Sequence, residues 1–268
     1  MTELVPEPVF LRLVDWLKTY FVTGGMPEPV ADWIEHRDLT RTERIQRELL
    51  RTYELDFGKH VPRPDVPKVR LAWDAVPSQL ARENKKFVFA ALRGVGRARD
   101  YEHAIGWLEQ AGLVVKVRRV KAPSLPLAAL EDPHAFKLYF PDVGLLRAKA
   151  GLPARTLVEG DRLFQEFRGA LTENFVLQEL LAAVPEPPRY WSSQATAEVD
   201  FVVAIGAELF PLEAKASVNV KAKSLRVYTE KYRPRLALRA SLRNLRQDGN
   251  VLNVPLFLVG ELPRLCRA

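Results

Sequence analysis

Four acidic residues and one lysine in the C-terminal part of the chain have the types and spacing of a metal-dependent phosphodiesterase. They are Glu173, then Glu198 and Asp200, then Glu213 with Lys215 two positions later. Carboxylate oxygens are the ligands that Mg²⁺ prefers, and a bound cation polarises a phosphate and lowers the pKa of a bound water. If these side chains converge, they form a hydrolytic site. If they do not, they are ordinary charges in a chain of which 27% is charged.

Each residue of this set has an expected role. Asp200 and Glu213 would bind Mg²⁺ or Mn²⁺ directly, and Glu173 would bind a water in the metal shell or a second ion. Lys215 would position the attacking water or stabilise developing negative charge, and Glu198 would lie behind the direct ligands. These four, Lys215, Glu173, Asp200 and Glu213, are the predicted catalytic residues. The alternative is that Glu213 and Lys215 are an ion pair at a strand edge.

Two apolar stretches must position the acidic residues that follow the helix. Residues 198–205 and 209–215 are predicted strands, joined by a glycine turn. Residues two apart on a strand share a face. A hairpin would therefore bring Asp200, Glu213 and Lys215 to one surface.

A helix predicted over residues 161–183 positions Glu173. Its neighbours at helical spacing are apolar or small: Gly169, Ala170, Val176, Leu177 and Leu180. A carboxylate on the buried face of a helix costs about several kcal/mol unless it is paired or bound to metal. We therefore expect Glu173 to have a partner, and the acidic strands are candidates.

The rest of the chain divides into a helical N-terminal segment, residues 1–64, and a winged helix-turn-helix, residues 65–142. The first boundary follows from a cluster of prolines at positions 62, 64 and 67. In the winged segment we expect helices near residues 69–73, 87–92 and 100–111, and wing strands at 113–120 and 136–140.

The third part, residues 143–268, has the order helix, three strands, helix, two strands. Beyond the acidic hairpin we expect a strand at 189–192, a basic helix at 222–232 and closing strands at 236–240 and 255–259. The predicted fold class is α+β, with a central mixed sheet in this third part.

Basic residues occur where a nucleic acid would be contacted, and the net charge of +7 favours a polyanionic partner such as DNA. The third helix of the winged segment also carries acidic residues, so a protein-docking role is the alternative. The candidate nucleic-acid contacts are Arg97, Arg99, Arg118, Arg119 and Lys121 in the winged segment, and Lys221, Lys223 and Arg226 after the acidic hairpin.

Composition excludes several functional classes. A single cysteine, Cys266, excludes a disulfide framework and a cysteine-rich zinc site. The four histidines lack the spacing of metal ligands. No apolar run approaches the roughly 20 residues of a membrane span, so we expect a soluble, cytoplasmic protein. The chain has no P-loop motif G-x-x-x-x-G-K-[ST], so it is expected to bind no nucleotide and to have no ATPase activity alone.

Several segments along the whole chain resemble one family in the same order. The family is the domain-of-unknown-function half that follows an AAA-type P-loop module in many bacterial and archaeal proteins grouped with the ATPases. The segments that carry the resemblance are residues 20–28, 53–57, 107–113, 137–145, 173–176 and 198–201.

The resemblance implies a winged helix followed by a PD-(D/E)xK nuclease-like domain. In that pattern Glu173 matches the helix acid, Asp200 the first strand acid, and Glu213 with Lys215 the Glu-x-Lys pair. The ATPase module is missing here. We therefore expect a DNA-interacting protein with a Mg²⁺-dependent, endonuclease-like C-terminal domain. The alternative is a non-catalytic module that binds DNA or docks a separate P-loop ATPase.

Overall fold

A computed structural model of the chain describes residues 4–82, 85–92, 98–155, 165–193, 197–216 and 223–267. The chain forms two compact units. We call Met1–Leu17, Val117–Phe136 and Phe175–Ala268 the sheet unit, and Lys18–Lys116 with Lys137–Asn174 the helical unit.

Helices make up most of the helical unit, as expected for the N-terminal part of the chain. Its elements, some of which extend into the sheet unit, are α1 (Glu7–Thr23), α2 (Pro27–His36), α3 (Leu39–His60), α4 (Val66–Leu80), η1 (Phe89–Ala91), α5 (Ala98–Gln110), α6 (Val143–Lys149) and α8 (Gln165–Ala183). Its core includes Phe57 and Trp73, whose rings meet edge to face with centroids 6.0 Å apart. The helices of the predicted winged segment occur in the expected order, with the second reduced to the short 3₁₀ turn η1.

The prediction that Pro27 and Pro29 mark a break between helices is wrong, because helix α2 begins at Pro27. Both prolines lie in the first turn of α2. The N–H groups of a first turn have no partner within the helix, and the fixed φ of proline suits the turn. The chain does leave α1 at Gly24, which has a positive φ of 67°.

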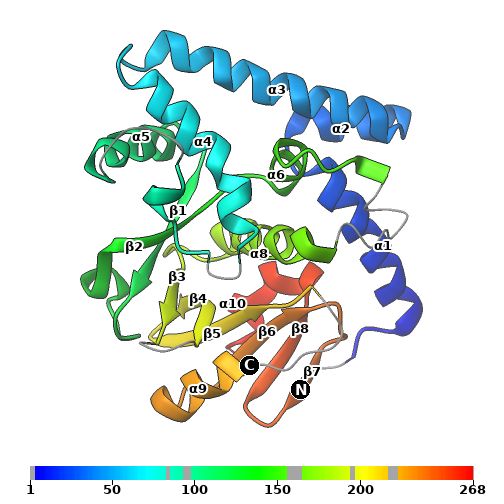
Figure 1. Cartoon of the computed structure of the whole chain (residues 1–268). Coiled ribbons are helices and arrows are strands. Elements are labelled where there is room, and N and C mark those ends of the chain that lie inside the picture. The colour runs from blue at the N-terminus through cyan, green and yellow to red at the C-terminus, as the bar shows by residue number, and fades with distance from the viewer. Residues whose placement is uncertain are drawn as a thin grey trace. The chain divides into compact units, whose positions relative to one another are not determined.

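An eight-stranded mixed sheet lies in the described part of the chain, in the order β2-β1-β3-β4-β5-β6-β8-β7. The strands are β1 (Val115–Val120), β2 (Glu131–Tyr139), β3 (Arg189–Ser192), β4 (Glu198–Ile205), β5 (Glu208–Ala214), β6 (Ala237–Ser241), β7 (Arg246–Asp248) and β8 (Val251–Pro255). Figure 1 shows β4, β5, β6 and β8 side by side. The predicted α+β class and the mixed sheet are confirmed.

The strands predicted as a wing, β1 and β2, are neighbours in this sheet. Strand β1 also pairs in parallel with β3, with Arg119 opposite Tyr190. The wing is therefore continuous with the sheet that carries the acidic residues. The domain boundaries expected after residues 64 and 142 stay a prediction.

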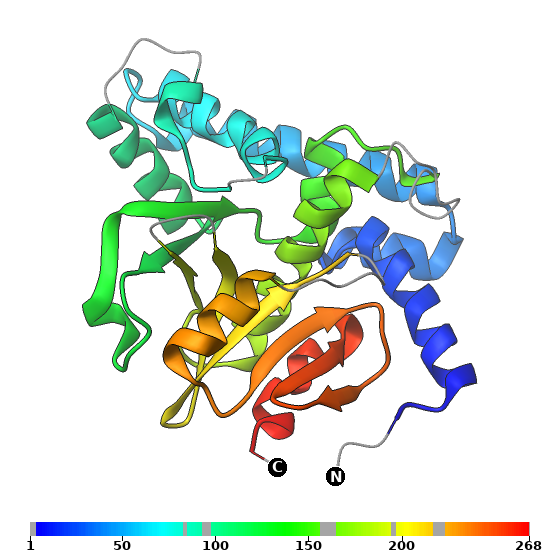
Figure 2. The ribbon, with the colours of Figure 1, turned by 60° about the horizontal axis from the view of Figure 1, so that its bottom comes forward.

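Helix α9 (Lys223–Tyr232) covers one face of the sheet. Leu225 and Tyr228 of α9 pack against Val202 of β4 and Ala237 of β6 in one apolar cluster. Figure 2 shows α9 in front of the sheet and the C-terminal helix α10 (Leu262–Leu265) behind it. Among the described residues, no helix has the length and apolar character needed to cross a membrane.

The last predicted strand, residues 255–259, is wrong. The strand in this region, β8, ends at Pro255, and the 3₁₀ helix η4 (Leu256–Glu261) follows it. Leu256 and Val259 are buried, which accounts for the apolar pattern. A short apolar run does not distinguish a buried strand from a buried helical turn.

Candidate functional site

The hairpin of β4 and β5 brings together Asp200 and Glu213, two of the three acids predicted to bind metal. The strands are antiparallel with Phe201 opposite Leu212, so the next pair in the register is Asp200 and Glu213. Residues directly opposite each other point to the same face of a sheet. The backbone N–H of Ala214 donates to Asp200 Oδ2 at 2.9 Å, which ties the Asp200 carboxylate to β5.

Lys215 joins this pair directly after β5. Its Nζ lies 2.6 Å from Glu213 Oε1, and its backbone N–H donates to the carbonyl of Ala240 at 2.8 Å. The Lys215 side chain is 32% exposed, whereas that of Glu213 is only 6% exposed. The lysine is therefore partly exposed to solvent while its ammonium group contacts a buried carboxylate. This contact agrees both with the interpretation as an ion pair and with the interpretation as a catalytic lysine.

One oxygen of the Glu213 carboxylate is available to bind a ligand. Within the described residues, Glu213 Oε2 is buried and has no hydrogen-bond partner. A buried polar atom without a partner is unusual and calls for a bound water or ion. With the Asp200 carboxylate it provides the hard oxygen donors that Mg²⁺ prefers.

The described residues contain no group of three or more His, Cys, Asp or Glu side chains arranged to hold a metal ion. Two carboxylates fit the usual Mg²⁺ shell only when waters and substrate phosphate supply the other ligands. Glu198 lies on the same face as Asp200, opposite Ser192 of β3, and is partly buried. The predicted residues from the two strands thus share one face of the sheet unit.

Glu173 has a different environment. It belongs to the helical unit and is 1% exposed, which confirms the predicted burial. Lys137 Nζ donates to Glu173 Oε1 at 3.1 Å, the hydroxyl of Tyr139 donates to the same oxygen, and Lys85 donates to Oε2. Burial raises the pKa of Glu173, but the charges of Lys137 and Lys85 outweigh it and hold the pKa well below its usual range.

The sequence analysis missed these partners of Glu173. Lys137 is fully buried within the apolar strand β2, and a lysine in an apolar strand is the signal that a counter-charge lies nearby. The side chain of Asn174, next to Glu173 on α8, also contacts the chain just after β2. It accepts a hydrogen bond from the N–H of Phe140 at 3.0 Å and donates one to the carbonyl of Phe140 at 3.1 Å. The charge of Glu173 is thus balanced within the helical unit.

Two of the predicted nucleic-acid contacts hold the edge of the sheet together. Arg118 Nε lies 3.5 Å from Glu131 Oε2. Arg119 is hydrogen-bonded to Asp132 and donates to Ser192 Oγ at 3.3 Å. Its hydrogen bond keeps the pKa of Asp132 below the ordinary value. Both arginines therefore link neighbouring strands.

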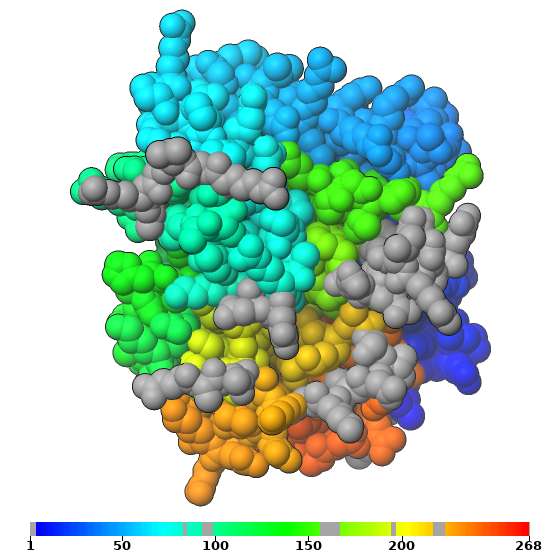
Figure 3. All heavy atoms as spheres, viewed as in Figure 1, coloured from blue at the N-terminus to red at the C-terminus, as the bar shows by residue number. Residues whose placement is uncertain are grey.

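The other predicted contacts differ in environment. Arg99, Lys121, Lys223 and Arg226 are exposed. Arg226 Nε also lies 3.6 Å from Glu230 Oε1 one turn along α9, and Figure 3 shows side chains of α9, in orange, at the molecular surface. Arg97 and Lys221 lie outside the described residues.

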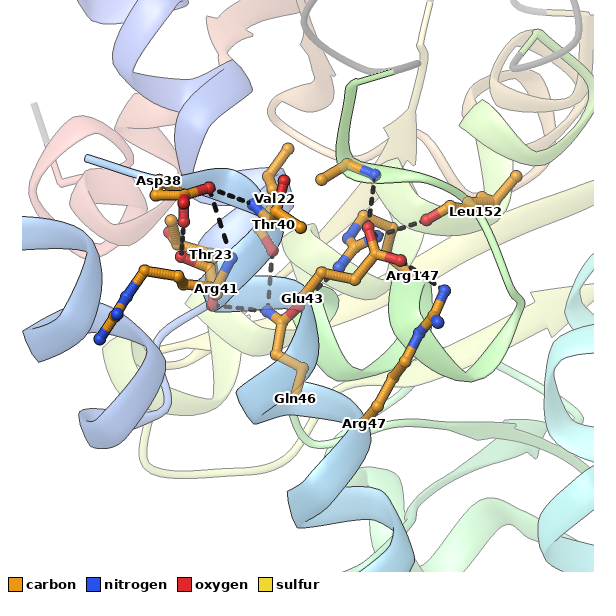
Figure 4. A network of polar contacts seen from close by, with 12 residues as sticks. Val22, Thr23, Asp38, Thr40, Arg41, Glu43, Gln46, Arg47, Arg147 and Leu152 are labelled. Carbon is orange, nitrogen blue, oxygen red and sulfur yellow. Dashed lines mark hydrogen bonds and ion pairs between the residues drawn. The ribbon is translucent and has the colours of Figure 1, made fainter. Parts of the chain in front are cut away.

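A second polar network lies inside the helical unit (Figure 4). Gln46 Nε2 donates to the carbonyls of Val22 at 2.8 Å and Thr23 at 2.9 Å. Arg147 donates through Nη2 to Gln46 Oε1 at 2.5 Å, and its Nη1 lies 3.6 Å from Glu43 Oε2. Burial lowers the pKa of Arg147 to about 10. The network joins the end of α1 to α3 and α6.

Two glycines allow the backbone to approach closely at this network. A Cβ atom on Gly144 would lie 2.6 Å from Gln46 Nε2 and 2.7 Å from the backbone nitrogen of Gly24. Asp142 caps α6 by accepting from Leu145 N at 2.8 Å, and it also accepts from Gly25 N at 2.7 Å. Two of the segments that carry the family resemblance, 20–28 and 137–145, therefore meet in a structural junction.

Comparison with known proteins gives two family matches. Residues 168–257 match a domain of unknown function, DUF4143, and residues 14–156 match another, DUF8612. No curated protein and no solved structure matches the chain. Since the second match spans more than half of the 268 residues, the chain belongs to the DUF8612 family, a domain of unknown function.

Proposed function

We propose that this protein interacts with DNA and that its sheet unit hydrolyses phosphodiester bonds with the help of Mg²⁺ or Mn²⁺. The observation that carries the proposal is the geometry of the β4–β5 hairpin. It sets Asp200 opposite Glu213, places Lys215 at 2.6 Å from Glu213, and leaves a buried Glu213 oxygen without a partner among the described residues. This is the donor set expected for a hard cation with a cationic group beside it.

The roles of the protein groups follow from their positions. Asp200 and Glu213 would hold the cation, and the N–H of Ala214 fixes the orientation of the Asp200 carboxylate. The ion would lower the pKa of a water and polarise the scissile phosphate. The ammonium group of Lys215, one-third exposed, can donate to a phosphate oxygen on which negative charge develops.

Glu173 has no place among the metal ligands in this proposal. Two lysines and a tyrosine already bind its carboxylate oxygens. A carboxylate neutralised in this way is a poor ligand for a further cation, because the cation would have to displace those donors. Glu173 instead stabilises the helical unit.

A cleavage assay tests the proposal. Purified protein is incubated with linear, supercoiled and single-stranded DNA and with Mg²⁺ or Mn²⁺. Asp200→Asn and Glu213→Gln are each expected to reduce the rate by about 100-fold or more. Glu261→Gln, which removes an exposed acid elsewhere in the sheet unit, is expected to cut at the wild-type rate. Cutting that survives the combined Asp200→Asn and Glu213→Gln substitution would sink the proposed site.

A second candidate function is a non-catalytic module that docks a separate P-loop ATPase. The match to DUF4143 favours it, because that family is commonly the C-terminal part of AAA-ATPase proteins. The engagement of Arg118 and Arg119 in ion pairs also leaves less free positive charge on β1 for DNA. No cleavage of any substrate, together with co-elution of an AAA-type ATPase encoded beside the gene, would select this function over hydrolysis.

A further inference from the structure

The sheet unit contains a small basic pocket, and none of the site residues predicted from the sequence lines it. It has a volume of about 250 Å³ and lies around the loop between β6 and β7. Three arginines and two asparagines line most of it, and one apolar and one acidic residue complete it. The residues are Arg239, Arg243, Arg246, Asn244, Asn253, Leu4 and Asp248. We call it the arginine pocket.

Hydrogen bonds that are buried or partly buried fix the shape of the arginine pocket. Asn253 is 5% exposed, and its Nδ2 donates to the carbonyls of Arg243 at 3.2 Å and Asn244 at 3.0 Å. The hydroxyl of Ser241 donates to Asn253 Oδ1 at 2.7 Å. Asn244 in turn exchanges two hydrogen bonds with the backbone of Val5, at 3.0 Å and 2.7 Å. The loop is therefore held from both sides, so the pocket is preformed.

The charges of the arginine pocket are not balanced by its own residues. Arg246 Nε is paired with Asp248 Oδ1 at 2.9 Å, and Asp248 is the one acid that lines the pocket. Arg239 Nε is buried and, within the described part of the chain, has no hydrogen-bond partner. A buried guanidinium N–H without an acceptor carries the full cost of desolvation. Three guanidinium groups facing one carboxylate therefore make a site for an anion.

The position of the pocket relates it to the acidic hairpin within the same unit. In the register of the sheet, Glu213 pairs with Arg239, Arg239 with Asn253, and Asn253 with Arg246. Paired residues share a face, so Asp200 and these four form one polar row across β4, β5, β6, β8 and β7. At about 4.8 Å per strand, the row extends roughly 14 Å from Glu213 to Arg246.

We propose that the arginine pocket binds a phosphate group of the DNA strand on which the acidic hairpin acts. The planar guanidinium group matches phosphate oxygens in two parallel hydrogen bonds, which explains why arginines and not lysines line the pocket. A phosphate held there would lay the strand along the polar row toward Asp200 and Glu213. The link to hydrolysis rests on the proposed function, but phosphate binding by the pocket does not.

Binding of a fluorescein-labelled single-stranded oligonucleotide in EDTA tests the pocket without any cleavage. The test variant is Arg243→Gln with Arg246→Gln, both exposed side chains. The control is Arg264→Gln, which removes the charge of one arginine that is 74% exposed and is also paired with a neighbouring acid. We expect the double variant to bind about 10-fold more weakly. The slope of log affinity against log salt should fall by roughly 0.7, because the contact to one phosphate of a single strand is lost.

Two results separate this proposal from the proposed function. Affinity of the double variant equal to that of Arg264→Gln overturns the pocket, even if the wild-type protein cuts DNA. Weakened binding by the double variant with unchanged binding by Asp200→Asn supports the pocket, even if nothing is cut. In a second arm, inorganic phosphate at constant ionic strength should displace the oligonucleotide from wild-type protein. Equal displacement from the double variant would contradict a phosphate site in the pocket.

Discussion

Replacing Glu173 by glutamine should destabilise the protein strongly, because it removes the negative charge between a buried lysine, Lys137, and a partly buried one, Lys85. Lys137 is fully buried and the side chain of Lys85 is 17% exposed. An amide at position 173 keeps an oxygen for Tyr139 and Lys137 but leaves the positive charges of Lys137 and Lys85 uncompensated. Removing one partner of a buried ion pair costs about 3–5 kcal/mol. We expect a loss of this size in the free energy of unfolding at neutral pH.

The same contacts predict how this loss depends on pH. The pKa of Glu173 is lowered in the folded state, so the folded protein binds a proton less readily than the unfolded chain does. The stability that the carboxylate contributes is complete above its unfolded pKa, whose ordinary value is 4.5. It is lost as the pH falls toward the lower folded pKa. The difference between wild-type and Glu173→Gln protein should therefore be constant at neutral pH and shrink in acid.

Urea denaturation followed by far-UV circular dichroism measures the effect. A matched control is Glu179→Gln on the same helix, where burial raises the pKa and the amide should be neutral or stabilising. Replacing Glu173 by leucine together with Lys137 by methionine should cost less than Glu173→Gln, because it removes both buried charges. A loss below about 1 kcal/mol for Glu173→Gln, no larger than that of an exposed pair, would refute the reasoning.

Two further predictions concern packing and reactivity. Gly144→Ala should lower the free energy of unfolding by about 3 kcal/mol, because the new Cβ would lie 2.6 Å from Gln46 and 2.7 Å from the Gly24 backbone. Gly169→Ala, where nothing lies within 4 Å, is the control in urea denaturation, and equal effects would contradict the close packing. Burial raises the pKa of the Cys266 thiol from 9.0 to about 11, so alkylation by iodoacetamide at pH 8 should be about 100-fold slower in folded than in unfolded protein. Equal rates would show that the thiol is accessible.

Local patterns allowed much of the fold to be predicted from the sequence. The strand at residues 189–192 and the strand at 198–205 have the predicted bounds, because short apolar runs rich in aromatic and β-branched residues and bounded by proline or glycine are typical of strands. The apolar stripe beside Glu173 also allowed the burial of this residue to be predicted correctly. The strand predicted at 255–259 was wrong, because a strand and a 3₁₀ turn can both bury a short run of apolar residues.

Side-chain partners far apart in the sequence could not be predicted in the same way. Glu173 meets Lys85 and Lys137, which are 88 and 36 positions away, so no spacing rule relates them. Arg239 lies in a strand near its predicted bounds, yet its neighbourhood depends on the register of parallel strands. The hairpin of Asp200 and Glu213 was predictable because a short turn fixes which residues face each other.

Binding of Mn²⁺ tests most directly the claim that Asp200 and Glu213 form a cation site. Electron paramagnetic resonance of free Mn²⁺ during a titration reports how many ions the protein takes up. We expect wild-type protein to bind Mn²⁺ and Mg²⁺ to compete with it, because both are hard cations with oxygen ligands. Glu213→Gln should bind at least about 10-fold more weakly, while Glu261→Gln should be unchanged. Equal Mn²⁺ affinity in wild-type and Glu213→Gln protein would contradict the account.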